Sequence, residues 1–336
     1  MKLRLLIGAA ALSLLTIAGC NSSSIEDALD LVDEPDRKTV DTAGLGINAF
    51  ANDSRFGSIS AQLSEVKNTL KLNHIRILMN WSDSVQSSPS GAYNFSFYDD
   101  LVARIPSGVD ALVILNGVPS WMNDASNWEG GNPRLTFVNH WVKEATKRYG
   151  GHSRIIGFQI WNEPNNDLAD NILLGLRDSA PNYVELLAAA ENYVRENAPG
   201  KLLLNAATTA INQNYPETLD YNRAMRDAGA LNLVDVWALH FYGSQYENVV
   251  RNGGVEDFAD GLGKRIWVTE SGAQGVNKQL EYAERTFAFL REKLDTLERI
   301  YIYQFTEATP SDVSYGLRTL DSAFPVSDLY IELKNR

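Results

Sequence analysis

From Gly44 to the end of the chain, short apolar runs alternate with longer amphipathic stretches. The runs are rich in β-branched residues and have the length of strands, whereas the longer stretches repeat apolar residues every three or four positions, as half-buried helices do. The pattern predicts eight strands, at Gly44–Phe50, His74–Met79, Ala111–Leu115, Ile155–Trp161, Leu202–Ala206, Val234–Phe241, Arg265–Thr269 and Arg299–Phe305. Helices are predicted between and after them, among others at Ser60–Leu72, Phe97–Ile105, Leu135–Tyr149, Tyr183–Asn197, Glu217–Ala228, Asn277–Leu297 and Val326–Asn335.

Strands that alternate with helices in this way build parallel βαβ units. Eight such units between residues 44 and 336 fit one (β/α)₈ barrel, whose usual size is about 250 residues plus insertions. No G-x-G-x-x-G loop follows the first strand, which argues against a dinucleotide-binding fold. The sequence therefore predicts the α/β class and a single (β/α)₈, or TIM, barrel that forms one domain over residues 44–336.

The first twenty residues follow a different pattern. A basic start precedes an apolar stretch that is too short for a comfortable transmembrane helix. This layout is typical of a secretory signal peptide, and a buried N-terminal helix is the plainer alternative. Ala18-Gly19-Cys20 resembles the lipobox of bacterial lipoproteins, in which the lipidated cysteine becomes the mature N-terminus. The resemblance implies a signal peptide over residues 1–19, a lipid anchor at Cys20 and a place in the bacterial cell envelope, on the outer membrane if the source is Gram-negative.

Residues 20–43 are predicted to form an acidic tether behind the anchor. The stretch from Glu26 to Asp41 contains seven acidic residues and only two basic ones, Arg37 and Lys38. A stretch so polar and so charged is typical of a solvated linker. We expect it to hold the barrel away from the lipid surface.

Charge and composition narrow the choice of ligand. The chain carries 42 acidic and 30 basic residues, a net charge of -12, and its aromatic content is 10%. Nucleic-acid binding needs a basic surface, so nucleic acid is excluded as a partner, and a neutral or cationic ligand is favoured. The chain has only four histidines and one cysteine, so it has few ligands for a zinc site and cannot form a disulfide within the chain. A monomer is expected.

Polar and aromatic residues gather at the predicted strand ends, where a barrel of this kind builds its active site. They are Arg76, Asn80, Trp81, Asn116, Trp121, Asn162, Glu163, His240, Tyr242, Glu270, Tyr303 and Phe305. Two carboxylic acids, Glu163 and Glu270, thus stand across the barrel mouth from each other. Two carboxyl groups that flank one bond are what glycoside hydrolysis requires.

Two segments resemble the motifs of glycoside hydrolase clan A, with families 5 and 39 the most similar: Trp161-Asn162-Glu163-Pro164 and Ile266-Trp267-Val268-Thr269-Glu270. The resemblance covers the whole predicted barrel. It implies a retaining mechanism in which Glu163 is the acid/base and Glu270 the nucleophile. Because carboxyl groups supply both the proton transfer and the covalent step, no metal ion or organic cofactor is expected.

The resemblance also implies supporting residues. Asn162 is similar to the asparagine that holds the sugar 2-hydroxyl, and Arg76 to the arginine that supports the nucleophile. Tyr242 is expected to hydrogen-bond Glu270, with His240 lining the same subsite. A turn-capping asparagine, a surface ion pair and a core histidine are the plainer alternatives for Asn162, Arg76 and His240.

Aromatic residues are the candidate sugar platforms. The candidates among the tryptophans are Trp81, Trp121 and Trp128, and packing within loops is the plainer alternative for each. Many clan members carry a tryptophan near the end of the last strand, but this chain has none there, so Phe305 or Tyr303 is the expected substitute. Glu307 follows closely and is interpreted as a loop or substrate-contacting residue rather than a third catalytic acid.

The leading hypothesis is a lipid-anchored retaining glycoside hydrolase. Its expected substrate is a β-linked polysaccharide or oligosaccharide: an exopolysaccharide, or a plant-type glucan, mannan or xylan. A transglycosylase on the same barrel and a non-catalytic carbohydrate-binding lipoprotein are the alternatives. A metal-dependent amidohydrolase would need histidine clusters that the sequence lacks. The sugar, the linkage, and endo or exo action depend on the shapes of the loops after the third and fourth strands.

Overall fold

The computed structural model describes residues 34–211 and 216–336. The expected signal peptide, Cys20 and the tether up to residue 33 lie outside the described residues. Within the described part, no helix is both long enough and apolar enough to cross a membrane.

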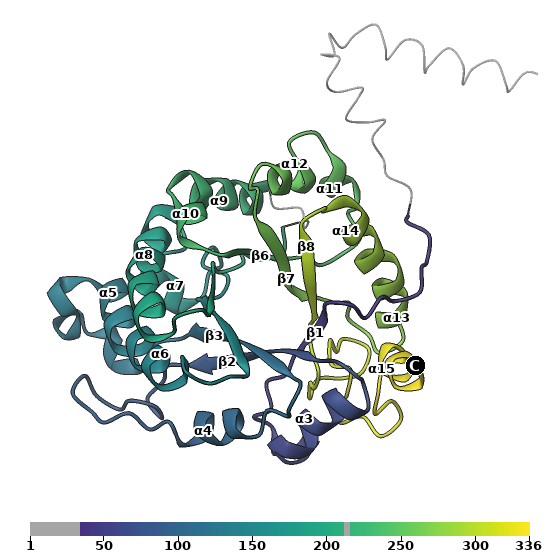
Figure 1. Ribbon diagram of the computed structural model, residues 1–336, viewed down its shortest axis with the longest axis horizontal. Helices are drawn as coiled ribbons and strands as arrows, with labels where there is room; N and C mark the ends of the chain where they lie inside the picture. Colours follow the sequence, from purple (N-terminus) through teal and green to yellow (C-terminus); the bar gives the residue numbers. More distant parts are fainter. Residues whose placement is uncertain (1–33, 212–215) are drawn as a thin grey trace, which may run out of the picture. The chain divides into compact units, whose positions relative to one another are not determined.

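Eight parallel strands close into a barrel in the order of the sequence (Figure 1). The last strand pairs with the first, with Leu45 opposite Ile300, which completes the closure. This arrangement confirms the predicted single (β/α)₈ barrel. The strands are β1 (Leu45–Asn48), β2 (His74–Asn80), β3 (Asp110–Asn116), β4 (Ile155–Ile160), β5 (Leu202–Leu204), β6 (Val236–His240), β7 (Arg265–Ser271) and β8 (Leu297–Ile302).

Helices surround the barrel on its outside (Figure 1). Asn132 caps the start of one of them by accepting hydrogen bonds from the backbone N–H groups of Arg134 and Leu135, ahead of a proline in the first turn. The helices are α3 (Ile59–Asn68), α4 (Ser96–Ala103), α5 (Pro133–Phe137), α6 (Lys143–Tyr149), α7 (Ala169–Leu173), α8 (Ala180–Asn197), α9 (Pro216–Asp227), α10 (Ala230–Leu233), α11 (Glu247–Val250), α12 (Val255–Asp260), α13 (Gln279–Tyr282), α14 (Ala288–Lys293) and α15 (Asp328–Asn335).

Two predicted helices are each divided by a wider, π-helical turn. Val138–Val142 joins α5 to α6, and Ala283–Phe287 joins α13 to α14. The predicted end of the second helix, at Leu297, is wrong, because α14 ends at Lys293 and Leu297 is the first residue of β8. Leu290, Leu294 and Leu297 repeat at a helical spacing, so periodicity alone does not separate the helix end from the strand start.

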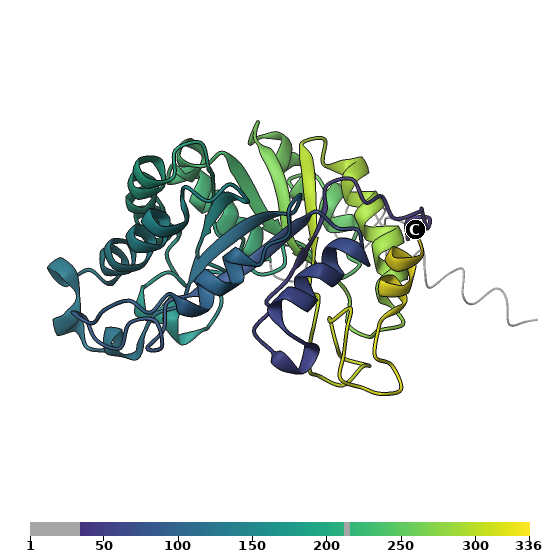
Figure 2. The same cartoon turned by 60° about the horizontal axis from the view of Figure 1, so that its bottom comes forward.

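The barrel interior is filled by side chains, so it is a core and not a pore. Leu112, Leu204, Trp267 and Tyr301 are among the buried residues of this cluster. Gly46 makes room for the Tyr301 ring, which would lie 2.6 Å from a Cβ atom at that position. Space for a ligand is therefore left at the ends of the strands, where the following loops rise. In Figure 2 the long loop after β8, drawn in yellow, and the loops after β2 and β3, drawn in blue, lie along the same side.

Residues 35–43, which the sequence analysis assigns to the tether, lie against the helices that follow β7. The Lys38 backbone N–H donates to the Glu284 carbonyl at 3.0 Å, and its ammonium pairs with Glu292 at 2.9 Å. Val40 is buried, and its carbonyl accepts a hydrogen bond from Arg336 at the C-terminus. The described part of this segment therefore belongs to the barrel body rather than to a solvated linker.

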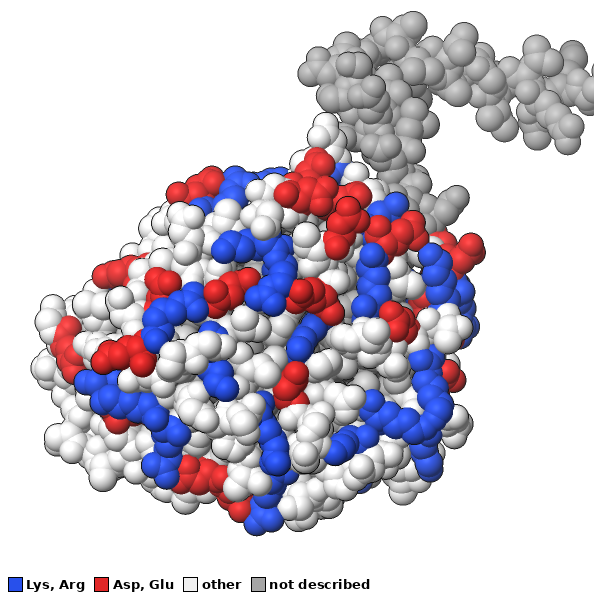
Figure 3. Space-filling view, viewed as in Figure 1, with Lys and Arg blue, Asp and Glu red and all other residues white. Residues whose placement is uncertain are grey.

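Charges of both signs are mixed on the surface. Figure 3 shows Lys and Arg side chains interspersed with Asp and Glu over the face that Figure 1 presents. Charged residues of the described part also form pairs, such as Arg195 with Asp235 at 2.8 Å and Arg148 with Asp99 at 2.5 Å. This face therefore carries no large basic patch, in keeping with the acidic net charge of the chain.

Candidate active site

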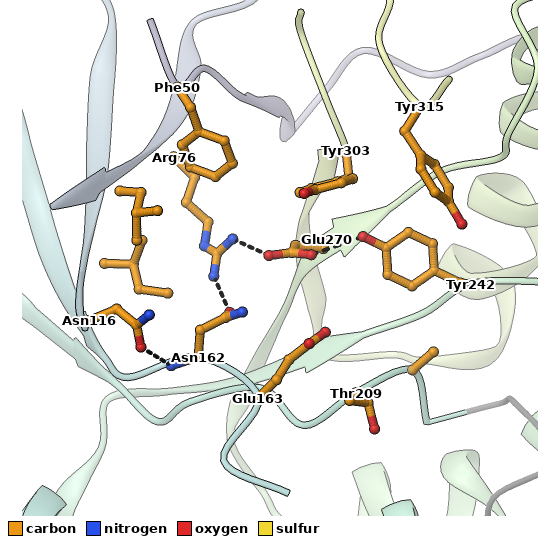
Figure 4. A pocket seen from close by; sticks show the side chains of 13 residues that line it. Phe50, Arg76, Asn116, Asn162, Glu163, Thr209, Tyr242, Glu270, Tyr303 and Tyr315 are labelled. Carbon is orange, nitrogen blue, oxygen red and sulfur yellow. Dashed lines mark hydrogen bonds and ion pairs between the residues drawn. The ribbon is translucent and has the colours of Figure 1, made fainter. Parts of the chain in front are cut away.

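A cavity of about 420 Å³ opens at the C-terminal ends of the strands, within the size range of about 300–1,000 Å³ that is usual for small-molecule sites. Side chains from all eight strands or the loops that follow them converge on it (Figure 4). The lining residues are Phe50, Arg76, Leu78, Ile114, Asn116, Asn162, Glu163, Thr209, Ala210, Tyr242, Glu270, Tyr303 and Tyr315.

Glu163 reaches the cavity from a strained turn after β4. Trp161 and Glu163 have φ values of 74° and 42°, which side-chain-bearing residues rarely adopt. The turn is held by hydrogen bonds: the Trp161 indole donates to Asn171 at 2.7 Å, and the Asn171 amide donates to the Glu163 carbonyl at 2.8 Å. The Glu163 N–H donates to the Ala207 carbonyl at 2.9 Å. These bonds offset the strain and turn the Glu163 carboxyl into the cavity.

Glu270 lies near the end of β7 and is held by two donors. Its Oε1 accepts from Arg76 Nη1 at 2.6 Å, and its Oε2 accepts from the Tyr242 hydroxyl at 2.9 Å. Burial raises the pKa of Tyr242 well above its usual range, and the charge of Glu270 raises it further. The Tyr242 hydroxyl therefore stays protonated and donates, which is the hydrogen bond expected from the sequence. Both donors fix the position of the Glu270 carboxyl in the cavity.

Arg76 is 1% exposed, and every contact of its guanidinium is with a polar side chain. Besides Glu270, it donates to Asn48 at 2.8 Å, to Gln159 at 2.8 Å and to Asn162 at 2.9 Å. A buried charge requires such partners, so the surface ion pair considered for Arg76 does not apply. The same contacts fix the Asn162 side chain beside the nucleophile candidate.

His240 lies between the two carboxyl groups and is fully buried. Its Nδ1 is 3.0 Å from Glu163 Oε1, and its Nε2 is 3.6 Å from Glu270 Oε1. Burial by itself raises the pKa of Glu163, but the hydrogen bond and the electrostatic interaction with His240 outweigh it. The net effect lowers the pKa of Glu163. His240 is thus a contact of both acids rather than an isolated core histidine.

Glu163, His240 and Glu270 also satisfy a simple distance test for metal binding, since one ligand atom from each lies within 4.8 Å of the others. The Arg76 guanidinium, 2.6 Å from Glu270, occupies one side of the same group with a positive charge. A divalent cation would be repelled by it. The arrangement fits two acids held by Arg76 and His240 better than it fits a metal centre.

A family model described as cellulase (glycosyl hydrolase family 5) matches residues 34–299. The chain belongs to glycosyl hydrolase family 5. It is a glycoside hydrolase of the clan that the two glutamate motifs predict. No curated protein matches the sequence.

Several solved glycoside hydrolases share the fold. A family 39 enzyme from Bacteroides cellulosilyticus WH2 has a TM-score of 0.61 and 16% identity, over 91% of this chain and 64% of that one. An endo-1,4-β-mannanase from Rhizomucor miehei has a TM-score of 0.61 and 16% identity, over 88% and 95% of the two chains. An endoglucanase from Thermotoga maritima has a TM-score of 0.56 and 16% identity, over 87% and 97%. The chain spans just under two thirds of the Bacteroides enzyme, and at these identities the likeness shows the fold alone.

The structure does not bring every expected platform to the cavity. Trp81 is 1% exposed and stacks on His140 at 5.6 Å, with its indole donating to Gln86. Trp121 packs edge-on against Trp81 at 5.1 Å, and Phe305 is 1% exposed. None of Trp81, Trp121, Trp128 and Phe305 is among the residues that line the cavity. The loops after β2 and β3 thus use their tryptophans to pack on each other and on the π-helical turn that holds His140.

Other lining residues carry the aromatic surface instead. Tyr303, considered in the sequence as a substitute for the missing tryptophan, lines the cavity, as do Phe50 and Tyr315. Phe50 is the last residue of the first predicted strand, so its place at a strand end could have identified it as a lining residue. Tyr315 lies in the middle of the loop after β8, where no sequence pattern points to it.

Glu307 holds the loop after β8 in place by hydrogen bonds. Its Oε2 accepts hydrogen bonds from the backbone N–H groups of Tyr315 at 2.6 Å and Gly316 at 3.2 Å, and from the Ser314 hydroxyl at 3.0 Å. These bonds fix the loop at the point where Tyr315 enters the cavity. Glu307 is thus a loop residue, in agreement with its interpretation from the sequence.

Proposed function

We propose that this family 5 enzyme hydrolyses a neutral, β-linked polysaccharide or oligosaccharide with retention of configuration. The observation that carries the proposal is the closeness of the two acids, since an oxygen of Glu163 lies within 4.8 Å of an oxygen of Glu270. Retaining enzymes hold their carboxyl groups about 5–5.5 Å apart, whereas inverting enzymes leave about 6.5–9.5 Å for a water molecule. The separation supports retention.

The clan motifs assign the two roles, with Glu163 as the acid/base and Glu270 as the nucleophile. In the first step Glu270, held by Arg76 and Tyr242, attacks the anomeric carbon while Glu163 gives its proton to the departing oxygen. In the second step Glu163 takes a proton from water, the water oxygen attacks the anomeric carbon, and the Glu270 carboxylate leaves. Asn162, fixed by Arg76, is proposed to hold the sugar 2-hydroxyl.

The charges of the site favour a neutral sugar. Among the described residues that line the cavity, Arg76 is the only cationic one, and its guanidinium already donates to four side chains. A uronic acid would therefore find no free cation among the described lining residues, and it would face two glutamates in a chain with a net charge of -12. The similar structures include an endo-1,4-β-mannanase and an endoglucanase, so mannan and glucan are the first substrates to test.

A polysaccharide panel tests the proposal. Purified enzyme is incubated with β-glucan, mannan, xylan, bacterial exopolysaccharide and, as an acidic control, polygalacturonate, and new reducing ends are measured. We expect reducing ends from a neutral polymer and none from the acidic one, with Glu270→Gln as the inactive control. Glycosyl transfer without a rise in reducing ends would indicate the transglycosylase, and binding without any product would indicate the carbohydrate-binding protein.

The His240 contact leads to a prediction on pH. In His240→Leu the hydrogen bond and the electrostatic interaction that lower the pKa of Glu163 are gone, while its burial remains, so this pKa should rise. Since the general acid must be protonated, the alkaline limb of kcat/KM should move to higher pH. The measurement is a pH profile of both enzymes on one substrate. An unchanged limb in a folded variant, or a shift to lower pH, would contradict the role given to His240.

We also propose that the chain is a lipoprotein anchored in the bacterial envelope through Cys20. The support is the sequence pattern before this residue, which is the only cysteine of the chain. Several acyl chains together give stable membrane binding, whereas one chain binds only marginally. Cys20→Ser should release the protein from membranes or leave its precursor unprocessed, with activity retained. Membrane fractionation that is unchanged, and still needs detergent for release, would rule out the anchor.

A further inference from the structure

Two tyrosines in the catalytic cavity have hydroxyl groups that the protein does not use. Tyr303 and Tyr315 both line the cavity, and neither hydroxyl has a hydrogen-bond partner among the residues that the structure describes. Tyr242 differs, because its hydroxyl is committed to Glu270. Neither the Tyr303 nor the Tyr315 hydroxyl oxygen is among the buried side-chain atoms that lack a partner, so both are open to the cavity. A free hydroxyl beside the nucleophile is therefore available to a ligand.

Tyr303 is the better placed of the two. Its ring is held by edge-on contacts with Phe50 at 6.4 Å, Tyr242 at 6.2 Å and Tyr315 at 5.8 Å between ring centroids. Figure 4 shows its hydroxyl directed toward the side of the cavity where Arg76 lies, and away from Tyr315. Three surrounding rings leave the phenol little freedom to turn, so the hydroxyl has a fixed place in the cavity.

The protonation state of Tyr303 suits a hydrogen-bond donor. Burial raises the pKa of its hydroxyl above the usual range, and the charges of Glu270 and Glu307 raise it further. A phenol can both donate and accept, whereas the indole of the tryptophan that many clan members carry near this point only donates. The change from indole to phenol thus alters what the site can recognise.

We propose that the Tyr303 hydroxyl is a specificity-determining group that hydrogen-bonds one hydroxyl of the sugar unit attacked by Glu270. The enzyme then prefers sugars that carry a hydroxyl at that position over those that lack it or present it differently. This inference rests on the proposed function, since it needs a sugar in the cavity. Sites built around such a bond reject analogues without the partner group, because a polar group is left unpaired.

The experiment pairs Tyr303→Phe with changes in the sugar. Wild-type and variant full-length enzymes are assayed on 2,4-dinitrophenyl β-glucoside, β-mannoside and β-xyloside, on monodeoxy analogues of the best of these, and on the polysaccharide that the enzyme cleaves. We expect kcat/KM of Tyr303→Phe to fall about tenfold on the parent glycoside and the polymer. On one deoxy analogue, the one that lacks the contacted hydroxyl, the two enzymes should be equal.

The control is Tyr193→Phe, which removes a tyrosine hydroxyl that donates to Asn139 at 3.0 Å on the helical layer. Its kinetics should match the wild type. Unchanged kinetics of Tyr303→Phe on the parent glycoside and the polymer would overturn the inference. An equal loss on every analogue, with a lower melting temperature, would also overturn it and assign Tyr303 a structural role. A folded wild-type enzyme that cleaves no glycoside would instead overturn the proposed function.

Discussion

Glu163→Ala is expected to slow the hydrolysis of substrates with poor leaving groups by about 10²–10⁴-fold, the usual contribution of a general acid. Activated aryl glycosides should still react, because their leaving groups need no proton. Since Glu163 is also the base of the second step, the glycosyl-enzyme intermediate should accumulate. Azide needs no base, so it should release the intermediate as the β-glycosyl azide, with retained configuration for a β-linked substrate.

Glu270→Ala is the matched variant and should behave in the opposite way. It should be inactive on the same aryl glycoside, because no covalent intermediate forms. Any azide product should have inverted configuration, since azide then attacks in place of the carboxylate. NMR of the azide products separates the outcomes. An inverted product from Glu163→Ala would show that the two roles are exchanged, contrary to the assignment that the clan motifs imply.

The parts of the fold and site that depend on strand register were predictable. Buried parallel strands give short apolar runs, and their carboxyl ends meet at one end of a barrel, so the residues after each run were predicted to meet. Glu163, Glu270, Arg76, Asn162 and Tyr242 do line one cavity. Each stands within three residues of a strand end or inside a strand, where the chain has little freedom.

The parts that depend on loop conformation were not predictable. Trp81 follows β2 directly, yet its indole stacks on His140 instead of lining the cavity. Tyr315, by contrast, lies far along the loop after β8 and lines the cavity. The position of Tyr315 depends on Glu307, whose carboxylate accepts three hydrogen bonds from the same loop. Hydrogen bonds within one irregular loop, here between residues 7 to 9 positions apart, leave no periodic signal in a sequence.

Arg76→Met is expected to lower the free energy of unfolding by about 3–5 kcal/mol, the usual cost of leaving one member of a buried ion pair without its partner. Arg76 is 1% exposed and Glu270 is 6% exposed, so water compensates the carboxylate only in part once the guanidinium is gone. Three further acceptors, Asn48, Gln159 and Asn162, lose their donor at the same time. Urea denaturation of the wild type and variant measures the loss.

Two further variants show whether the lost charge is the cause. Arg195→Met breaks an exposed pair with Asp235, at 2.8 Å, and should cost no more than about 1 kcal/mol. Adding Glu270→Gln to Arg76→Met removes the uncompensated carboxylate, so the double variant should be more stable than Arg76→Met alone. Equal losses in Arg76→Met and Arg195→Met, or no recovery in the double variant, would contradict the buried-charge account. Recovery would show that Arg76 is fixed in the core by the carboxylate that the proposed chemistry needs ionised.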